Sequence, residues 1–195
     1  MKRLIDFAKN IKNKDLKDKT LKFLKEPSLS NPEMVYPTCD MKKCPSWIGT
    51  HHSNEGGLLE HTLSVTEICL SIADTFEKTY KTKINRDHLI AGALLHDISR
   101  LFLLKKDRGW NFTGCILDHA TFSACELYAR GFPEEVVHIV GSHGGDMGAA
   151  SAHPRTIEAL ILHHADVIDA SGESMIRGTP DPFQFLLMGA DENGE

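Results

Sequence analysis

Residues 89–100 read LIAGALLHDISR, and this stretch decides the fold that the sequence predicts. Leu89, Ala93 and Leu94 recur at helical spacing, so we expect a helix over about residues 87–96 with these side chains facing inward. His96 lies three residues after Ala93 and falls on the same face, and Asp97 follows it directly. The helix is therefore expected to end in two polar side chains that point toward the interior.

Three other stretches place polar residues on inward faces in the same way. They read GGLLEHTLSV (56–65), SHGG (142–145) and EALILHHADVIDA (158–170). His61 lies on the apolar face of its predicted helix, and His143 continues the apolar face of the preceding helix. His163 and Asp166 are three residues apart and share one side of a helix. Four helices therefore direct imidazoles or carboxylates toward the interior.

The rest of the chain also reads as helices joined by polar loops, with no long alternating run that marks a strand. Further helices are expected over about residues 57–76, 118–129, 133–141 and 154–169, and a polar loop over 105–114. Pro133 and Pro154 are expected in the first turns of the last two helices, where proline is tolerated. We therefore predict an all-α fold: a helical arm and linker over residues 1–45, one helical bundle over 46–180 and a C-terminal tail over 181–195. The amphipathic arm is free either to cover the core or to join a partner.

The composition narrows the classes of function. With 22 basic and 27 acidic side chains, the chain carries a net charge of −5, which gives no overall attraction to nucleic acid or to an anionic membrane. No apolar run approaches the ~18 residues that cross a membrane, and the N-terminus lacks a signal-peptide core. The 5 cysteines show no regular spacing, as expected of reduced thiols, so we expect a cytoplasmic protein.

The buried polar residues indicate a metal ion. A buried imidazole without a hydrogen-bond partner, or a buried carboxylate without a counter-charge, is costly in free energy. One such residue is more often a satisfied core or cap residue, but here Asp97, Asp166 and the inward histidines repeat that cost on several helices. A shared divalent cation removes the cost. Mixed His and Asp ligands suit manganese, iron, zinc, cobalt or nickel better than calcium.

These motifs resemble those of the HD superfamily of metal-dependent phosphohydrolases. The superfamily signature of a lone His, a His-Asp doublet and a distant Asp corresponds here to His61, His96-Asp97 and Asp166. The sequence of these motifs is most similar to the HD module of YhaM-type 3′-to-5′ exoribonucleases. In that module a His-His pair, here at residues 51–52, also precedes the GGLLEH run. The resemblance covers about residues 44–170 and implies a single helical HD domain.

The resemblance also implies a role for each matching residue. A first metal ion would be bound by His61, His96, Asp97 and Asp166. A second ion, found in two-metal members, would share Asp97 and add His119 and His143. His51 and His52 would lie near the mouth of the site, where they would either contact the substrate or support the structure, and His163 would support a ligand from behind. Asp169, three residues past Asp166, is a further candidate for orienting a ligand.

Positive residues just beyond the doublet are candidates for holding a phosphate group. The planar guanidinium of Arg100 can bind phosphate oxygens in a fixed geometry, and we assign it to catalysis together with Asp97. Lys105 and Lys106 are weaker candidates, because a solvated loop explains them better than phosphate binding does. A phosphate ester suits such a site, because divalent ions stabilise the negative charge that grows on phosphate oxygens.

The leading hypothesis is a metal-dependent phosphohydrolase that cleaves a phosphomonoester or phosphodiester in a nucleotide or short oligonucleotide. A small phosphate ester is preferred, because the chain shows no counterpart of the nucleic-acid-binding domain of the exoribonucleases. An exoribonuclease-like activity on short RNA remains an alternative. So does a non-catalytic module that binds metal and nucleotide, which is favoured by two departures from the pattern: Ser99-Arg100 replaces Gly-Lys, and Gly144 replaces a second His. A homo-oligomer also remains open.

Cys39 and Cys44 raise a separate hypothesis, a zinc site that includes His51 and His52. The spacing of the two cysteines is at the long end of structural zinc motifs, and no regular His spacing follows. We therefore expect no zinc site at these residues.

Overall fold

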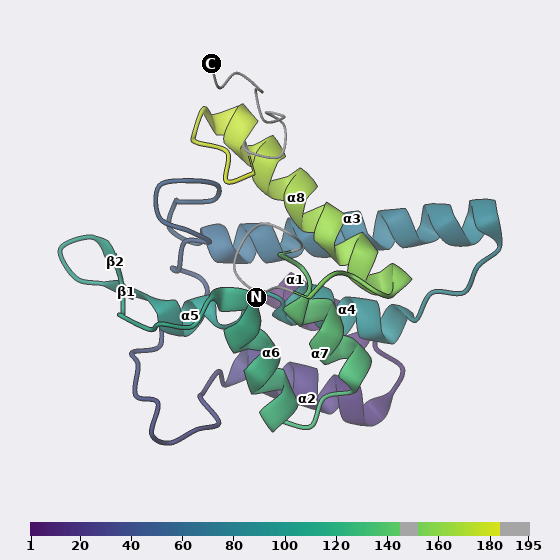
Figure 1. Cartoon of the computed structure of the whole chain (residues 1–195), viewed down its shortest axis with the longest axis horizontal. Coiled ribbons are helices and arrows are strands. Elements are labelled where there is room, and N and C mark those ends of the chain that lie inside the picture. The colour runs from purple at the N-terminus through teal and green to yellow at the C-terminus, as the bar shows by residue number, and fades with distance from the viewer. Residues whose placement is uncertain (145–151, 184–195) are drawn as a thin grey trace, which may run out of the picture.

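The computed structural model describes residues 1–144 and 152–183. Most of these residues form helices, and a short antiparallel hairpin lies between two of them (Figure 1). In chain order the elements are α1 (Lys2–Lys9), α2 (Lys14–Lys25), α3 (Gly57–Tyr80), α4 (Arg86–Leu95), α5 (Arg100–Leu103), β1 (Leu104–Lys106), β2 (Trp110–Phe112), α6 (His119–Ala129), α7 (Glu134–Gly141) and α8 (Ile157–Arg177). The predicted all-α fold is confirmed. Within the described ranges no helix is both long enough and apolar enough to span a membrane.

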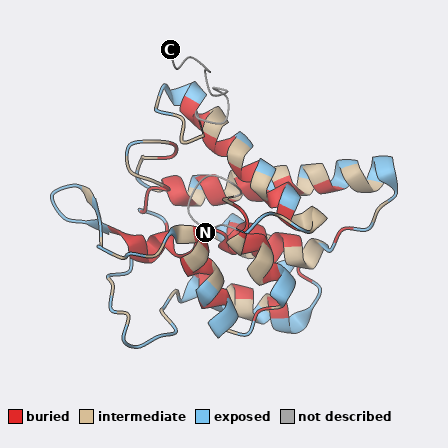
Figure 2. Cartoon of the chain, in the orientation of Figure 1, coloured by how far each residue is buried: buried red, intermediate tan, exposed pale blue. Residues whose placement is uncertain are grey.

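The central element of the bundle is α4. Its residues 89–95 are all buried, and it packs against α1, α2, α3, α7 and α8. Close packing on α7 requires Gly92, because a Cβ at that position would lie 2.4 Å from Cγ2 of Ile139. Figure 2 shows the buried faces of the surrounding helices turned toward the middle of the molecule. The His-Asp doublet that follows α4 therefore emerges in the interior.

The N-terminal arm folds as two helices that cover the bundle. The second helix is capped by Asn13, whose side chain accepts a hydrogen bond from the backbone N–H of Leu16. The carboxylate of Asp87 on α4 accepts hydrogen bonds from the backbone N–H groups of Lys12 and Asn13. Apolar residues of both arm helices belong to the same core cluster as α4. The arm therefore covers part of the core.

The Gly-Gly pair at the start of α3 permits a close crossing of the chain. Gly56 has a φ of +82°, a backbone conformation that glycine adopts without steric cost. A Cβ on Gly57 would lie only 2.0 Å from the backbone carbonyl oxygen of His52. The loop that carries His51 and His52 therefore lies directly on the first turn of α3.

Three local predictions are wrong. Pro133 is the N-cap of α7 and not a first-turn residue, and α8 begins only at Ile157, after the capping residue Thr156, and continues to Arg177. The expected polar loop of residues 105–114 contains most of the β1–β2 hairpin. Gly145 of the SHGG motif and residues 184–195 of the expected tail lie outside the described residues.

Candidate metal centre

Three buried histidines are each fixed by a hydrogen bond through the ring nitrogen Nδ1. Nδ1 of His61, on α3, lies 2.7 Å from Oδ2 of Asp169 on α8. His96 and His143 each bond the backbone carbonyl oxygen three residues earlier in the chain, at 2.9 and 2.6 Å. Because Nδ1 donates in each case, Nε2 is the ring nitrogen that remains to bind a metal ion. These hydrogen bonds fix the orientation of the three imidazoles, and a bound ion would take the place of any proton on Nε2.

Asp97 lies between these rings. Its Oδ2 atom is 3.3 Å from Nε2 of His61 and 3.4 Å from Nε2 of His96. Its Oδ1 atom is 3.6 Å from Nε2 of His143 and 3.7 Å from Nε2 of His119. Oδ1 also forms an ion pair with Nε of Arg100 at 2.8 Å, yet neither oxygen accepts a well-formed hydrogen bond from the described residues. The carboxylate thus presents one oxygen to each of two pairs of imidazoles.

Two groups of metal-binding atoms result. In one, Nε2 of His61 lies 3.1 Å from Oδ1 of Asp166 and 3.2 Å from Nε2 of His96. The other consists of Asp97, His119 and His143, and within each group the candidate ligand atoms lie within 4.8 Å of one another. Ligand atoms sit about 2.0–2.2 Å from a transition metal, so atoms around one ion lie roughly 3–4 Å apart. The observed separations fit one ion in each group.

The unpartnered polar atoms support the same fit. Nε2 of His143 is buried and has no hydrogen-bond partner among the described residues, and the two Asp97 oxygens share that condition. Buried polar atoms are normally satisfied, because leaving them unpaired is costly. A divalent cation bound to these atoms removes the cost.

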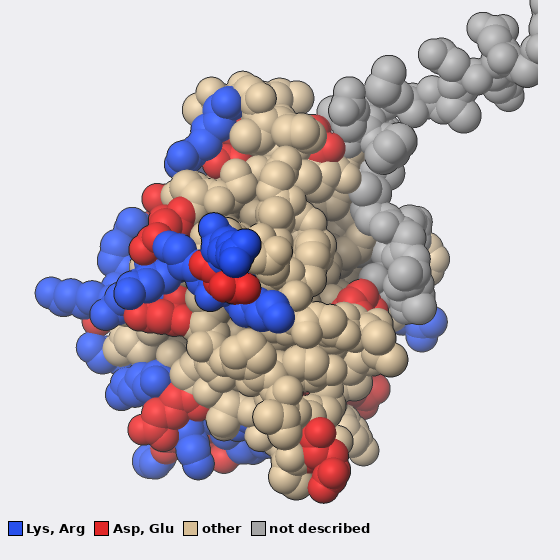
Figure 3. Space-filling model, turned by 90° about the vertical axis from the view of Figure 1, so that its left-hand side faces the viewer, with Lys and Arg blue, Asp and Glu red and all other residues tan. Residues whose placement is uncertain are grey.

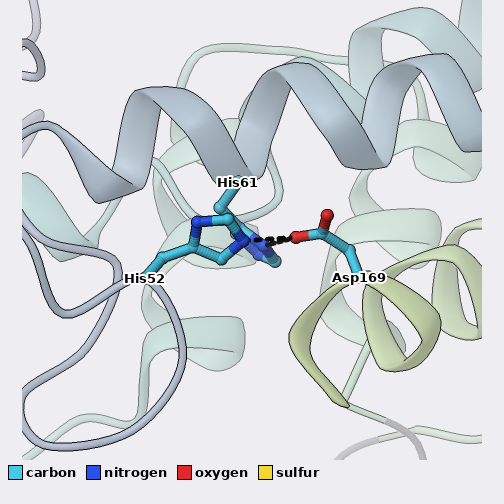
Figure 4. A group of neighbouring side chains, drawn as sticks. All are labelled: His52, His61 and Asp169. Carbon is cyan, nitrogen blue, oxygen red and sulfur yellow. Dashed lines mark hydrogen bonds and ion pairs between the residues drawn. The ribbon is translucent and has the colours of Figure 1, made fainter. Parts of the chain in front are cut away.

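A third group of potential ligands, which contains His52, His61 and Asp169, is explained by hydrogen bonds alone. In Figure 4 the carboxylate of Asp169 points at both imidazoles, and its Oδ2 atom lies 2.8 Å from Nε2 of His52 and 2.7 Å from Nδ1 of His61. The backbone N–H of His52 in turn donates to Oε2 of Glu173 at 2.9 Å. Asp169 and Glu173 on α8 therefore fix His61 and the loop before α3.

The charges of the site favour a cation. Burial opposes ionisation of Asp97, but the positive charge of Arg100 together with the neighbouring imidazoles outweighs it, and the pKa of Asp97 lies well below its usual range. Burial likewise opposes ionisation of Asp166, but a hydrogen bond from His61 lowers its pKa overall. Burial disfavours the charged form of His61, yet the carboxylates around it raise the pKa of His61 well above its usual value. The chain alone thus balances ionised carboxylates with a protonated His61, a charge that a divalent ion can replace.

Arg100 is buried and held in place. Its Nη1 atom donates to the backbone oxygen of Ser46 at 2.6 Å and to Oγ of Ser46 at 2.8 Å, while Nε pairs with Asp97. The guanidinium carbon lies 5.0 Å from the centre of the Trp47 ring. Arg100 therefore links the metal-binding carboxylate to the loop that carries Trp47.

A cavity of about 540 Å³ adjoins both groups of ligands. Asp166, His119, Arg100 and His51 contribute polar atoms to its wall, and Trp47, Phe112 and apolar neighbours supply the remainder. Burial lowers the pKa of His51 to about 2 and that of His119 to about 3, so both rings are neutral at pH 7. The volume lies within the usual range of small-molecule sites.

Three predicted site residues lie elsewhere than expected. His52 bonds Asp169 and is not part of the cavity wall, because the tight crossing at Gly57 turns it toward α8. The side chain of Lys105 is exposed and Lys106 pairs with Glu55, so neither lysine lines the cavity. Nδ1 of His163 bonds the backbone oxygen of His143 and therefore supports the chain that carries that ligand.

The cysteine hypothesis is not supported. Cys39 and Cys44 hydrogen-bond each other, which lowers the pKa of Cys39 and raises that of Cys44. No group of potential metal ligands in the described parts of the chain includes a cysteine.

The sequence reasoning missed Trp47, Phe112, Ser46 and Glu173. Glu173 lies four residues after Asp169, a spacing that places both on one side of a helix and that indicates a shared role. Nothing in the local sequence marks Ser46, Trp47 or Phe112, because their neighbours in space come from distant parts of the chain.

Comparisons with known proteins agree with this geometry. The HD domain family model matches residues 58–171. The chain is 44% identical over 173 residues to the dihydroneopterin 2′,3′-cyclic phosphate phosphodiesterase of Methanocaldococcus jannaschii, and the alignment covers 87% of this chain and 69% of that protein. No solved structure matches the chain.

More distant similarity links the chain to the 3′-5′ exoribonucleases YhaM. It is 31% identical over 169 residues to the protein of Listeria monocytogenes, and the alignment covers 78% of this chain and 52% of that protein. It is also 31% identical over 144 residues to the protein of Bacillus subtilis, and the alignment covers 68% of this chain and 44% of that protein. The chain thus matches only about half the length of these exoribonucleases.

Proposed function

Since this chain belongs to the HD domain family of phosphohydrolases, we propose that it hydrolyses the 2′,3′-cyclic phosphodiester of a small nucleotide-like molecule. The observation that carries the proposal is the 44% identity, over 87% of the chain, to a phosphodiesterase of that specificity. As an HD phosphohydrolase the chain is an enzyme, so the non-catalytic module that Gly144 and Ser99-Arg100 favoured is set aside. The free cysteines support our placement of the reaction in the cytoplasm.

We propose that two divalent transition-metal ions, drawn from manganese, iron, zinc, cobalt and nickel, bind at the centre. His61, His96 and Asp166 would hold one ion, His119 and His143 would hold the other, and Asp97 would be a ligand shared by both. When bound, such ions supply Lewis-acid stabilisation of phosphate charge and make water nucleophilic at neutral pH.

The residues of the chain would position the substrate. Arg100 places a positive charge at the cavity wall beside Asp97, where it stabilises the single negative charge that a phosphodiester shares between its two non-bridging oxygens and the further charge that develops in the transition state. The neutral ring of His51, which also lines the cavity, can donate one hydrogen bond and accept another. Water adds to phosphorus, one ring P–O bond breaks, and the freed hydroxyl takes the proton that the water loses. The product is a 2′- or 3′-monophosphate.

The surface supports a small substrate over a polymer. Figure 3 views the molecule from the side of the β1–β2 hairpin, where lysine and arginine side chains mix with aspartate and glutamate and do not form a stripe. Binding of an RNA backbone relies on a basic surface that tracks the phosphates. The cavity volume of about 540 Å³ matches a single nucleotide-sized molecule.

The test compares two substrate classes in the presence of Mn²⁺, Fe²⁺ or Zn²⁺. We expect guanosine 2′,3′-cyclic phosphate to be opened to the monophosphate, while a short RNA with a free 3′-hydroxyl stays intact. Asp97→Ala should lose both bound metal and hydrolysis, because it removes the carboxylate that faces both groups of histidines. His164→Ala is the matched control, since this histidine of α8 is exposed.

Two outcomes would overturn the proposal. Release of mononucleotides from the RNA, with the cyclic phosphate untouched, would favour the exoribonuclease-like alternative. An unchanged metal content in Asp97→Ala, measured by elemental analysis, would refute the ligand assignment.

A further inference from the structure

The cavity beside the metal centre has an aromatic wall that the reaction at phosphorus does not require. Trp47, from the loop before α3, and Phe112, from β2, pack edge to face with ring centres 5.3 Å apart. Both residues line the cavity that also contains Asp166 and His119. A group bound at the metal centre therefore has this aromatic wall within the same cavity.

The Trp47 ring is fixed before any ligand binds. The Arg100 guanidinium lies over it at 5.0 Å, and the ring of His119 lies 5.8 Å from it. Arg100 is itself held by Ser46, the residue before Trp47, and by Asp97. A fixed ring loses little conformational freedom on binding, which favours affinity.

Phe112 is held differently. It is 52% exposed although it is large and apolar, and it lies at the open end of a short hairpin, away from the turn. Its backbone is paired with Leu104, a buried residue, so the hairpin fixes where the ring lies. Exposed aromatic surface in a cavity is a common feature of sites that bind flat rings.

We propose that Trp47 and Phe112 form the subsite that binds the heteroaromatic ring of the substrate, and that they determine its specificity. The inference rests on the proposed function, and it narrows the substrate class to cyclic phosphates that carry a purine-like or pterin-like ring. The phosphodiester lies at the metal centre and the flat ring packs on the indole. Every heteroaromatic ring has a face for such stacking, so the subsite selects for the presence of a ring.

The test uses two cyclic phosphates and compares their kcat/KM values. Guanosine 2′,3′-cyclic phosphate carries the ring, and glycerol 1,2-cyclic phosphate has the same five-membered phosphodiester without it. In Trp47→Leu the ratio of the two kcat/KM values should fall about 10-fold or more, whereas Trp47→Phe should keep most of the preference. Because the ratio cancels any general damage transmitted through Arg100, it reports the ring contact alone.

Two further variants guard against misfolding and indirect effects. Phe112→Ala changes an exposed side chain and should lower the ratio in the same direction. Trp110→Phe is the matched control, because Trp110 lies on the same hairpin, contacts Lys106 and does not line the cavity. It should leave the ratio unchanged. A ratio in both Trp47→Leu and Phe112→Ala within twofold of the unsubstituted protein overturns the proposal.

A binding measurement separates this proposal from the proposed function. The chain has 2 tryptophans, Trp47 and Trp110, so guanosine 2′-monophosphate should quench the fluorescence of Trp110→Phe and leave that of Trp47→Phe almost unchanged. If no cyclic phosphate is hydrolysed but this quenching pattern appears, the ring subsite stands and the reaction is wrong. If hydrolysis occurs and Trp47→Phe is quenched as strongly as Trp110→Phe, the reaction stands and the subsite is wrong.

Discussion

Asp169 offers the sharpest test of how the metal centre is built, because it would act on the ion only through a ligand. One of its oxygens, Oδ2, accepts hydrogen bonds from Nδ1 of His61 at 2.7 Å and from Nε2 of His52 at 2.8 Å. Residues that orient a metal ligand in this way typically contribute 10- to 100-fold to metal affinity, which is about 1.4–2.7 kcal/mol. Asp169→Asn keeps an acceptor oxygen but removes the charge, so we expect a loss of about 10-fold. Asp169→Ala removes both, and we expect about 100-fold.

The assay is a calorimetric or chelator-competition titration with Mn²⁺ or Zn²⁺, with activity measured at saturating metal. Ile168→Ala is the matched control, since it is the preceding residue of the same helix and its side chain is 56% exposed. Affinity in Asp169→Ala within twofold of the unsubstituted protein would show that His61 needs no support from α8, and the reasoning would fail.

Three further predictions concern the loop before α3 and the protons of the site. Glu173→Ala should lower the free energy of unfolding by about 1–3 kcal/mol in urea titrations, because it strands the buried backbone N–H of His52, and an unchanged midpoint would contradict this. Gly57→Ala should lower the free energy of unfolding by about 1–3 kcal/mol, because its Cβ would lie 2.0 Å from the His52 carbonyl oxygen. Gly172→Ala is the control and should not destabilise the protein, because a Cβ at that position meets no atom within 4 Å. Metal binding should release a proton from His61, whose pKa is raised, so the metal affinity should increase with pH up to that pKa. Calorimetric titrations in buffers of different ionisation enthalpy count the released protons. A count of zero would disprove this prediction.

The helices of the bundle could be predicted because their signals are local. The Gly-Gly pair marks the start of α3, and the helix predicted from residue 118 corresponds to α6, which begins directly after its capping residue Asp118. The prolines misled because Pro133 and Pro154 were both assigned to first turns, when one is a cap and the other lies outside its helix. The hairpin was missed because strands of three residues are too short to show alternation.

The candidate site divides in the same way. Helical spacing identified the inward faces that carry His61, His96 and Asp166, which the structure brings together. The position of His52 could not be predicted, because Glu173, which holds its backbone, is 121 residues away in the chain. The wall formed by Trp47 and Phe112 likewise depends on the contact between a loop and a hairpin, for which periodicity gives no signal.

The candidate metal ligands lie on or beside helices buried in the bundle, whereas Trp47 and Phe112 come from a surface loop and a surface hairpin. Substitutions confined to the cavity-facing side chains of Trp47 and Phe112 therefore leave the helix packing around α4 intact. A directed-evolution library confined to the cavity-facing positions of these two segments should yield variants that accept new side groups on the cyclic phosphate while retaining the reaction itself. The residues that would act on the phosphodiester and the residues that would bind the ring thus come from different segments, which offers a starting point for changing the substrate specificity.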